Sequence, residues 1–305
     1  MPTREFRPIQ LLHPRHWLLW LGIGVAWLLT LNGARSRRIL GPGLANLMRI
    51  TSPRRVHIAR VNLDRCFPKL NPMAQRQLLD ATLKSTAQGL LETAATWLHP
   101  RQLNHTPMRY KGLEHLDIGP KDNGILILGM HLSTLDLAGA ALAQKVPFNV
   151  MYKRNRNPVF EWLMRRGRGH YFAESIEQTN VRGVIRNLKA GQRVWYGLDQ
   201  DYGPDNAVFV PFFGYPAATL TAANRIARIT QSKVVFMRHY RFEDGSYEVE
   251  IFLPDQAFPT NSDEGDAALI NRHIEASIRK APEQYWWVHR RFKSTPSGRS
   301  SLYEQ

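Results

Sequence analysis

The sequence predicts an α/β fold in which helices cover a β-sheet. From about residue 110 onward, short apolar runs alternate with stretches whose apolar residues recur at helical spacing. Before that point, Asn71-Pro72 is typical of a helix N-terminus, and an amphipathic helical pattern follows it as far as His99-Pro100. Alternation of strands with helices is typical of a sheet between helical layers.

The elements of the sheet region follow one another along the chain. The apolar runs predict strands at Gly124–Met130, Phe148–Tyr152, Arg193–Asp199, Lys233–His239 and Tyr247–Phe252. Helical spacing predicts helices at Pro158–Arg168, Val181–Ala190 (closed by Gly191), Leu220–Thr230 and Asp266–Ala281. Asp244-Gly245 predicts a turn between the last two strands, inside a stretch from Glu243 to Asp266 with eight acidic and no basic residues.

Composition narrows the classes of protein. Of the 305 residues, 43% are hydrophobic, which excludes a disordered chain. The single cysteine, Cys66, excludes an intramolecular disulfide, and no cluster of Cys and His resembles a zinc site. The 41 Lys and Arg against 25 Asp and Glu leave a net charge of +16, so we expect a polyanionic partner: nucleic acid, an anionic membrane surface, or an acidic substrate or carrier protein.

Much of this charge lies in the first 66 residues, which hold eleven Arg against two acidic residues. Inside them the stretch Trp17–Ala34 is uncharged and contains three Trp, and as a helix it would span about 27 Å, close to the ~30 Å core of a bilayer. It predicts a membrane anchor over residues 1–34, with a signal peptide, a buried core helix and a helix lying in one leaflet as alternatives. Its basic flanks are nearly balanced and give no orientation: Arg4, Arg7 and Arg15 before it, and Arg35, Arg37 and Arg38 after it.

A candidate catalytic group follows the strand ILILGM. If His131 ends this strand and a helix begins at Ser133, the turn between them can bring the imidazole within reach of Asp136. The carboxylate would then hold Nδ1–H and leave Nε2 as a general base for a hydroxyl. The alternative is a capping box, in which Ser133 caps the helix and Asp136 is structural. A metal site has no further ligand at suitable spacing.

This pattern resembles the His-x4-Asp/Glu motif of glycerolipid-type acyltransferases, and its surroundings resemble the late acyltransferases of lipid A biosynthesis, the lauroyl, myristoyl and palmitoleoyl group. The resemblance runs over nearly the whole chain. It rests on LHPR at 12–15, VNL at 61–63 with CFP at 66–68, GILILGMHLSTLDL, NxNP at 155–158, GR at 167–168, DxDYGP at 199–204, VFVPxF at 208–213 and APEQYWWVHRRFK at 281–293.

The resemblance implies a central mixed β-sheet flanked by helices, with an N-terminal membrane-anchoring helix over 1–34 and a catalytic domain over 35–305. It implies an enzyme of the cytoplasmic face of the bacterial inner membrane. The reaction would move a fatty acyl group from acyl carrier protein to a 3-hydroxyacyl hydroxyl of Kdo-bearing lipid IVA. His131 would be the general base and Asp136 would orient it, with no cofactor, no metal, no acyl-enzyme and no nucleic-acid partner.

Other residues are candidates for binding the substrates. A basic cluster follows the predicted strand Phe148–Tyr152, and an Arg fork suits the phosphates of the acceptor, although a solvated helix face and a site for the acidic carrier protein remain alternatives. Asp199 and Asp201 lie in a motif that the resemblance places near the active site, and the following Tyr-Gly-Pro reads as a turn rather than a Mg²⁺ site. Backbone N–H groups near Ser133 are candidates for an oxyanion site. The predicted substrate-binding residues are Arg154, Arg168, Asp199, Asp201, Arg290 and Arg291.

Two alternative functions remain. One is an acyltransferase that acts on another glycolipid or on glycerol phosphate, against which the DxDYGP and APEQY motifs speak. The other is a basic, membrane-associated nucleic-acid-binding protein, for which the net charge would suffice but no recognisable motif is present.

Overall fold

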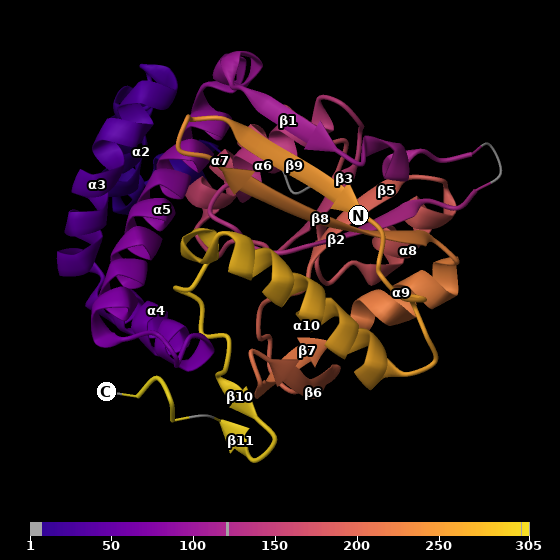
Figure 1. Cartoon of the computed structure of the whole chain (residues 1–305). Helices are drawn as coiled ribbons and strands as arrows, with labels where there is room; N and C mark the ends of the chain where they lie inside the picture. Colours follow the sequence, from indigo (N-terminus) through magenta and orange to yellow (C-terminus); the bar gives the residue numbers. More distant parts are fainter. Residues whose placement is uncertain (1–7, 120–121, 300, 305) are drawn as a thin grey trace.

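A computed structural model describes residues 8–119, 122–299 and 301–304. Its centre is a seven-stranded sheet in the order β1-β9-β8-β2-β5-β3-β4 (Figure 1). The pairs are parallel except for β8 with β9, so the expected mixed sheet is confirmed. The strands are β1 (Met108–Lys111), β2 (Ile125–Gly129), β3 (Asn149–Tyr152), β4 (Ser175–Glu177), β5 (Arg193–Gly197), β8 (Lys233–Arg241) and β9 (Tyr247–Phe252).

Helices flank this sheet, and two small hairpins complete the described part (Figure 1). The helices are α1 (Pro8–Leu12), α2 (Trp17–Leu29), α3 (Gly33–Thr51), α4 (Pro53–Cys66), α5 (Pro72–Leu98), α6 (Leu135–Ala143), α7 (Pro158–Arg168), α8 (Val181–Lys189), α9 (Ala222–Thr230) and α10 (Asp263–Lys280). The hairpins are β6 (Ala207–Phe212) with β7 (Tyr215–Leu220), and β10 (Ser294–Thr295) with β11 (Gly298–Arg299). The predicted strands and helices are confirmed, with ends that differ by at most three residues.

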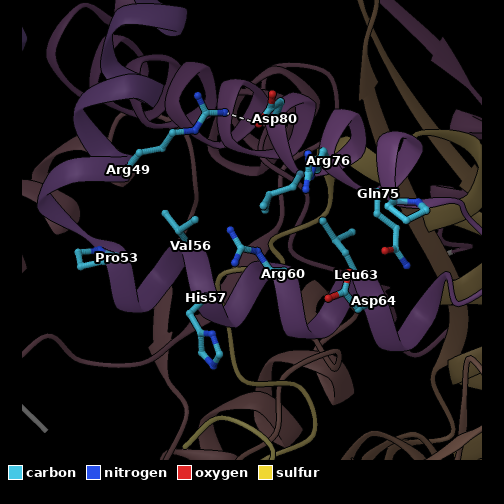
Figure 2. A pocket seen from close by; sticks show the side chains of 12 residues that line it. Arg49, Pro53, Val56, His57, Arg60, Leu63, Asp64, Gln75, Arg76 and Asp80 are labelled. Carbon is cyan, nitrogen blue, oxygen red and sulfur yellow. Dashed lines mark hydrogen bonds and ion pairs between the residues drawn. The ribbon is translucent and has the colours of Figure 1, made fainter. Parts of the chain in front are cut away.

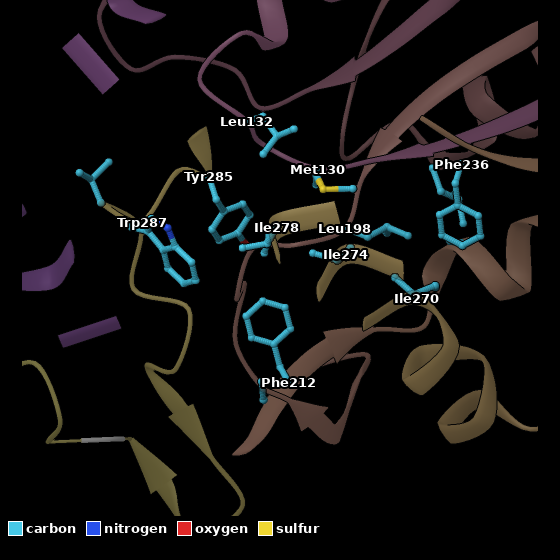
Figure 3. Packing of buried hydrophobic residues seen from close by; sticks show 14 of the residues in the cluster. Met130, Leu132, Leu198, Phe212, Phe236, Ile270, Ile274, Ile278, Tyr285 and Trp287 are labelled. Carbon is cyan, nitrogen blue, oxygen red and sulfur yellow. The ribbon is translucent and has the colours of Figure 1, made fainter. Parts of the chain in front are cut away.

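Strand β2 is apolar throughout because both of its faces are covered. Leu126 and Leu128 belong to the cluster that packs against α10, together with Met130 just after the strand (Figure 3). Ile125 and Ile127 point to the opposite face and pack with α6. A central parallel strand buried on both sides requires this uninterrupted apolar run.

Helix α5 is the longest helix of the described part and runs beside the sheet. Asn71 caps it by accepting a hydrogen bond from the N–H of Ala74 over 2.9 Å, and Pro72 occupies the first turn. Its 27 residues extend about 40 Å. Midway along it, Gly89 lies against Ser133, and a Cβ on Gly89 would come within 2.3 Å of the Ser133 carbonyl oxygen. The helix and the strand–helix turn after β2 are therefore in backbone contact.

The apolar N-terminal segment is shorter than expected. Helix α2 has 13 residues, about 20 Å of helix, and ends where the Thr30 hydroxyl donates back to the Ala26 carbonyl over 2.7 Å. In the described ranges, no helix combines the length and apolarity that crossing a bilayer requires. The structure therefore does not support a transmembrane helix here, and the uncharged stretch is divided between α2, a turn and the start of α3. Arg4 and Arg7 of the expected basic flank lie outside the described residues.

The expected domain boundary between residues 34 and 35 falls inside α3. This helix packs along α5, and its Arg37, only 2% exposed, donates to Gln102 Oε1 over 2.9 Å. Gln102 in turn donates to the carbonyls of Thr30 and Leu31 in the preceding turn. The first helices are thus fastened to the segment that follows α5.

We expect Gly89→Ala to lower the free energy of unfolding by about 1–3 kcal/mol, because its methyl group forces α5 away from Ser133. Gly43→Ala is the matched control: Gly43 lies in α3 with open space where the methyl group would stand, so alanine should be neutral or stabilising by up to about 1 kcal/mol. Denaturant unfolding measures both. Equal stability of the two variants would contradict the close contact.

Candidate functional site

Two neighbouring parallel strands carry the central residues of the site. Strands β2 and β5 pair in a register that sets Gly129 opposite Gly197. His131 lies two residues beyond Gly129, and Asp199 lies two residues beyond Gly197. Because the carboxyl ends of parallel strands meet at one edge of a sheet, this register brings His131 and Asp199 side by side. A Cβ on Gly197 would lie 2.8 Å from His131 Cε1, so this position has to be small.

His131 and Asp199 form a charged pair joined by two hydrogen bonds. His131 Nδ1 lies 2.6 Å from one carboxylate oxygen, and the His131 backbone N–H donates to the other over 2.9 Å. Burial disfavours the imidazolium, but the charge and the hydrogen bond of Asp199 outweigh it and raise the pKa of His131. Burial also disfavours the carboxylate, yet the charge and hydrogen bonds of His131 lower the pKa of Asp199 to about 2. With Nδ1 held in this way, Nε2 is the ring nitrogen left for chemistry.

Asp136, the expected partner of His131, has other contacts. Its Oδ1 accepts hydrogen bonds from Arg168 Nε over 3.1 Å and Nη2 over 3.0 Å, and from Trp97 Nε1 over 3.2 Å. The expectation that Asp136 holds Nδ1 of His131 is therefore wrong, because Asp199 occupies that nitrogen. Burial lowers the pKa of His131, and Asp199 raises it. The charge of Asp136 adds a smaller increase to the pKa of His131.

The turn after β2 also differs from the capping-box alternative. Helix α6 begins at Leu135 rather than Ser133, with Thr134 as its N-cap residue. The Ser133 hydroxyl pairs with that of Ser85 on α5 at 2.9 Å, and the Ser133 N–H donates to the Gln284 carbonyl over 2.7 Å. Ser133 therefore fastens the turn to its neighbours, and its N–H is already used and cannot serve as an oxyanion donor.

A cavity of about 500 Å³ opens beside His131. Volumes of this size are usual for small-molecule sites. Polar groups, including His131, Asp136, Lys153 and Arg168, lie on its wall. Its apolar part is formed by Gly139, Phe148, Val150, Met151, Met164, Phe172, Trp195 and Met237. The site therefore combines one histidine with an apolar chamber and with basic side chains on its wall.

Comparison with known proteins decides the family. The model of the bacterial lipid A biosynthesis acyltransferase family matches residues 5–294. The chain belongs to this family. It is 38% identical over 296 residues to the lipid A biosynthesis lauroyltransferase of Escherichia coli K12, covering 96% of this chain and 97% of the relative. It is 34% identical over 304 residues to the palmitoleoyltransferase of the same organism, covering 99% and 97%.

As a member of the family the protein is an acyltransferase of lipid A biosynthesis. This assignment replaces the nucleic-acid-binding alternative. A crystal structure of the 1-acyl-sn-glycerophosphate acyltransferase from Thermotoga maritima aligns with 81% of this chain and 97% of its own, at 16% identity and a TM-score of 0.38. That likeness is too low to support any conclusion about this acyltransferase.

The other predicted substrate-binding residues divide into buried and exposed groups. Arg291 is 1% exposed, and its guanidinium donates to the Ala218 carbonyl and to Thr219 and Asn271. Asp201 is equally buried and accepts hydrogen bonds from the N–H and hydroxyl of Ser294 and from the N–H of Gly203. Both residues hold the C-terminal segment in place, and neither lines the cavity, so their predicted contact with a substrate stays a prediction. Arg154 is exposed and lies 4.0 Å from Glu177, and Arg290 is half-buried; neither lines the cavity.

Sequence reasoning placed Asp199 near the active site but missed its role as the partner of His131. A usable signal was present, because both residues follow a buried strand that ends in glycine. It also missed His239, whose Nδ1 lies 2.7 Å from the Thr134 hydroxyl. Burial, with the charge of His131, lowers the pKa of His239 to about 3, so this imidazole is neutral and structural. Among the described residues, no group of three or more His, Cys, Asp or Glu could hold a metal ion.

We expect the pKa of His131 to lie above 6.5 and to fall in Asp199→Asn, because the substitution removes the negative charge that stabilises the imidazolium. Nuclear magnetic resonance titration of the imidazole carbons measures this shift. Asp201→Asn is the control, since Asp201 contacts Ser294 rather than His131. An unchanged His131 titration in Asp199→Asn would contradict the pairing.

Proposed function

We propose that this acyltransferase moves a fatty acyl group from the thioester of an acyl carrier protein to a 3-hydroxyacyl hydroxyl of Kdo-bearing lipid IVA. The observation that carries the proposal is the His131–Asp199 pair at the wall of an apolar cavity of about 500 Å³. A base beside a chamber for a hydrocarbon chain is what O-acylation by a fatty thioester requires. The curated relatives named for lauroyl and palmitoleoyl transfer support this choice of chemistry.

The proposed reaction uses His131 as both base and acid. Nε2 takes the proton of the acceptor hydroxyl while that oxygen attacks the thioester carbonyl carbon. The tetrahedral intermediate then collapses, the carbon–sulfur bond breaks, and the imidazolium returns the proton to the leaving thiolate. Asp199 stabilises the imidazolium between these two steps and fixes Nδ1 away from the substrate.

The surroundings favour direct attack over an acyl-enzyme. Cys66 is buried, and burial raises the pKa of its thiol, which keeps the sulfur protonated. The Ser133 hydroxyl bonds to Ser85, which also accepts a hydrogen bond from Arg241 Nη2 over 2.8 Å. The hydroxyl of Ser133 thus contacts another hydroxyl rather than a general base, and this contact does not activate it as a nucleophile. The acceptor hydroxyl is thus the proposed nucleophile.

Arg168 is the proposed contact for an anionic group of the acceptor. Its two hydrogen bonds to Asp136 hold the guanidinium on the cavity wall. Lys153 also lines the cavity, and the last turn of α7 carries Arg165 and Arg166 next to Arg168. Asp136 therefore acts in this proposal by positioning Arg168, and Arg154 remains a proposed outer contact.

Helices α1 and α2 are proposed to lie in the membrane interface. None of the residues of α2 is buried, and its exposed apolar side chains include Trp17, Leu18, Leu21, Val25, Trp27 and Leu28. Trp20 of α2 packs edge-on against Trp162 of α7, with ring centroids 5.6 Å apart. Phe160, also on α7, is exposed and lines the cavity. An interfacial helix here would place the cavity next to the bilayer, on its cytoplasmic side. A lipid acceptor could then enter the cavity from the bilayer.

We expect His131→Ala to lower kcat by about 10²–10⁴-fold, because it removes the base. Mass spectrometry of Kdo-lipid IVA after incubation with a panel of acyl carrier protein thioesters measures the product and its added acyl mass. In the wild type, kcat/KM should rise with pH through the raised pKa of His131, and the rise should move to lower pH in Asp199→Asn. Wild-type turnover by His131→Ala would refute the mechanism, and product only from glycerol phosphate would refute the acceptor.

We expect Leu18→Asp with Leu21→Asp to weaken binding to phosphatidylglycerol-containing vesicles by about tenfold or more, because both side chains would leave the lipid. Co-sedimentation of the full chain with vesicles measures this binding. Ile229→Asp, at another exposed apolar position, on α9, is the control and should bind as the wild type does. Equal binding by all three proteins would speak against the interfacial position of α2.

A further inference from the structure

A second and larger cavity, of about 790 Å³, lies outside the catalytic site. It is formed by the end of α3, by α4 and by the first turns of α5 (Figure 2). We call it the α4–α5 groove. Figure 2 shows Val56, Arg60 and Leu63 projecting from α4 toward α5. Val56, Leu63 and Leu79 give the groove an apolar floor, while Arg60 and Arg76 stand on its two rims.

The chain segment that forms the groove is basic, and three Arg (Arg49, Arg60 and Arg76) line the groove itself against Asp64 and Asp80. Residues 46–84 contain eight Arg and Lys against only Asp64 and Asp80. Asp80 is already paired with Arg49 at 2.5 Å. Two of the arginines have partners in the rest of the chain: Arg55 donates to the Val288 carbonyl, and Arg65 lies over the Tyr215 ring. The exposed basic residues of this stretch are Arg54, Arg55, Arg60, Lys69, Arg76 and Lys84, of which Arg60 and Arg76 line the groove.

Helix α5 connects this groove to the catalytic turn. Leu79 in the groove and Gly89 against Ser133 are ten residues apart, about 15 Å along the helix. The apolar helix α2 contacts α5 at its other end, where Trp27 packs against His99. From Leu79 to His99 the helix extends about 30 Å. The groove is therefore near the catalytic turn but far from the proposed membrane contact on α2. Figure 1 shows the same separation between α4, which forms the groove, and α2.

We propose that the α4–α5 groove is the docking site of the acyl carrier protein, with an acidic amphipathic helix of that protein lying between α4 and α5. The inference rests on the proposed acyl-carrier-protein donor. An apolar floor with cationic rims suits a helix that has an apolar stripe and acidic flanks. The 15 Å to the catalytic turn is a distance that the extended phosphopantetheine arm of a carrier protein can bridge.

The shape of the groove favours a protein over a bilayer. A concave site between two helices can be filled by a helix, whereas a bilayer surface would bridge its rims and leave the apolar floor unoccupied. The groove would thus receive the soluble donor, while the cluster on α7, next to α2, faces the lipid acceptor.

The test compares two charge reversals of equal size. Arg60→Glu with Arg76→Glu alters the groove, and Arg182→Glu with Arg186→Glu alters exposed arginines of α8 as a control. Fluorescence anisotropy measures binding of labelled acyl carrier protein to the full-length enzyme in detergent. We expect the groove variant to raise Kd about tenfold or more and the control to keep the wild-type Kd. Matching melting temperatures show that both variants are folded.

A kinetic measurement separates docking from catalysis. The groove variant should have a raised KM for the carrier-protein thioester but unchanged kcat/KM for the same acyl group on coenzyme A, which lacks the protein. Equal carrier binding by the wild type and the groove variant would overturn the proposal, as would a loss of binding to phosphatidylglycerol vesicles with carrier binding intact. Carrier binding without acylation of Kdo-lipid IVA would refute the proposed acceptor and leave the groove assignment standing.

Discussion

The parallel pairing of β2 with β5 is the constraint on which the site depends. Its register places Gly129 opposite Gly197, and the residues two positions further on, His131 and Asp199, meet at 2.6 Å. A shift by one residue would turn one of these side chains to the other face of the sheet. Gly197 must also lack a side chain, because a Cβ would collide with the imidazole. Backbone pairing deep in the core thus decides which carboxylate serves the histidine.

A buried ionic network holds the rest of the site against this edge. Glu92 of α5 is 1% exposed and accepts hydrogen bonds from Arg241 and from the Tyr247 hydroxyl. Gln284 bonds to the Arg241 backbone through both of its amide atoms, and its own carbonyl accepts from Ser133. Removing one member of a buried ion pair typically costs about 3–5 kcal/mol, so α5, the β8–β9 hairpin and the catalytic turn are locked together.

The basic residues that give the net charge of +16 have several separate roles in the folded chain. Arg37, Arg241 and Arg291 are buried or nearly so and bind carbonyl, amide or carboxylate oxygens of the protein itself. Arg168 is engaged by Asp136 at the cavity wall. Among the exposed basic residues, two groups lie near opposite ends of α5, one at the α4–α5 groove and one on α7 beside α2. This separation suits an enzyme that would take one substrate from solution and the other from a lipid surface.

The sequence by itself predicted five strands and four helices between residues 124 and 281 and the α5 cap at Asn71, because these depend on local periodicity and on motifs, but it did not predict β4, β6 and β7. The role of His131 as the reactive group is likewise a prediction from a motif. Only the tertiary structure decided that Asp199 rather than Asp136 holds the imidazole, since the partner comes from a strand 68 residues away. It also showed that Arg291 and Asp201 are buried and that the apolar helix α2 ends at Leu29. Pairing register and burial are set by contacts between distant segments, which local spacing does not encode.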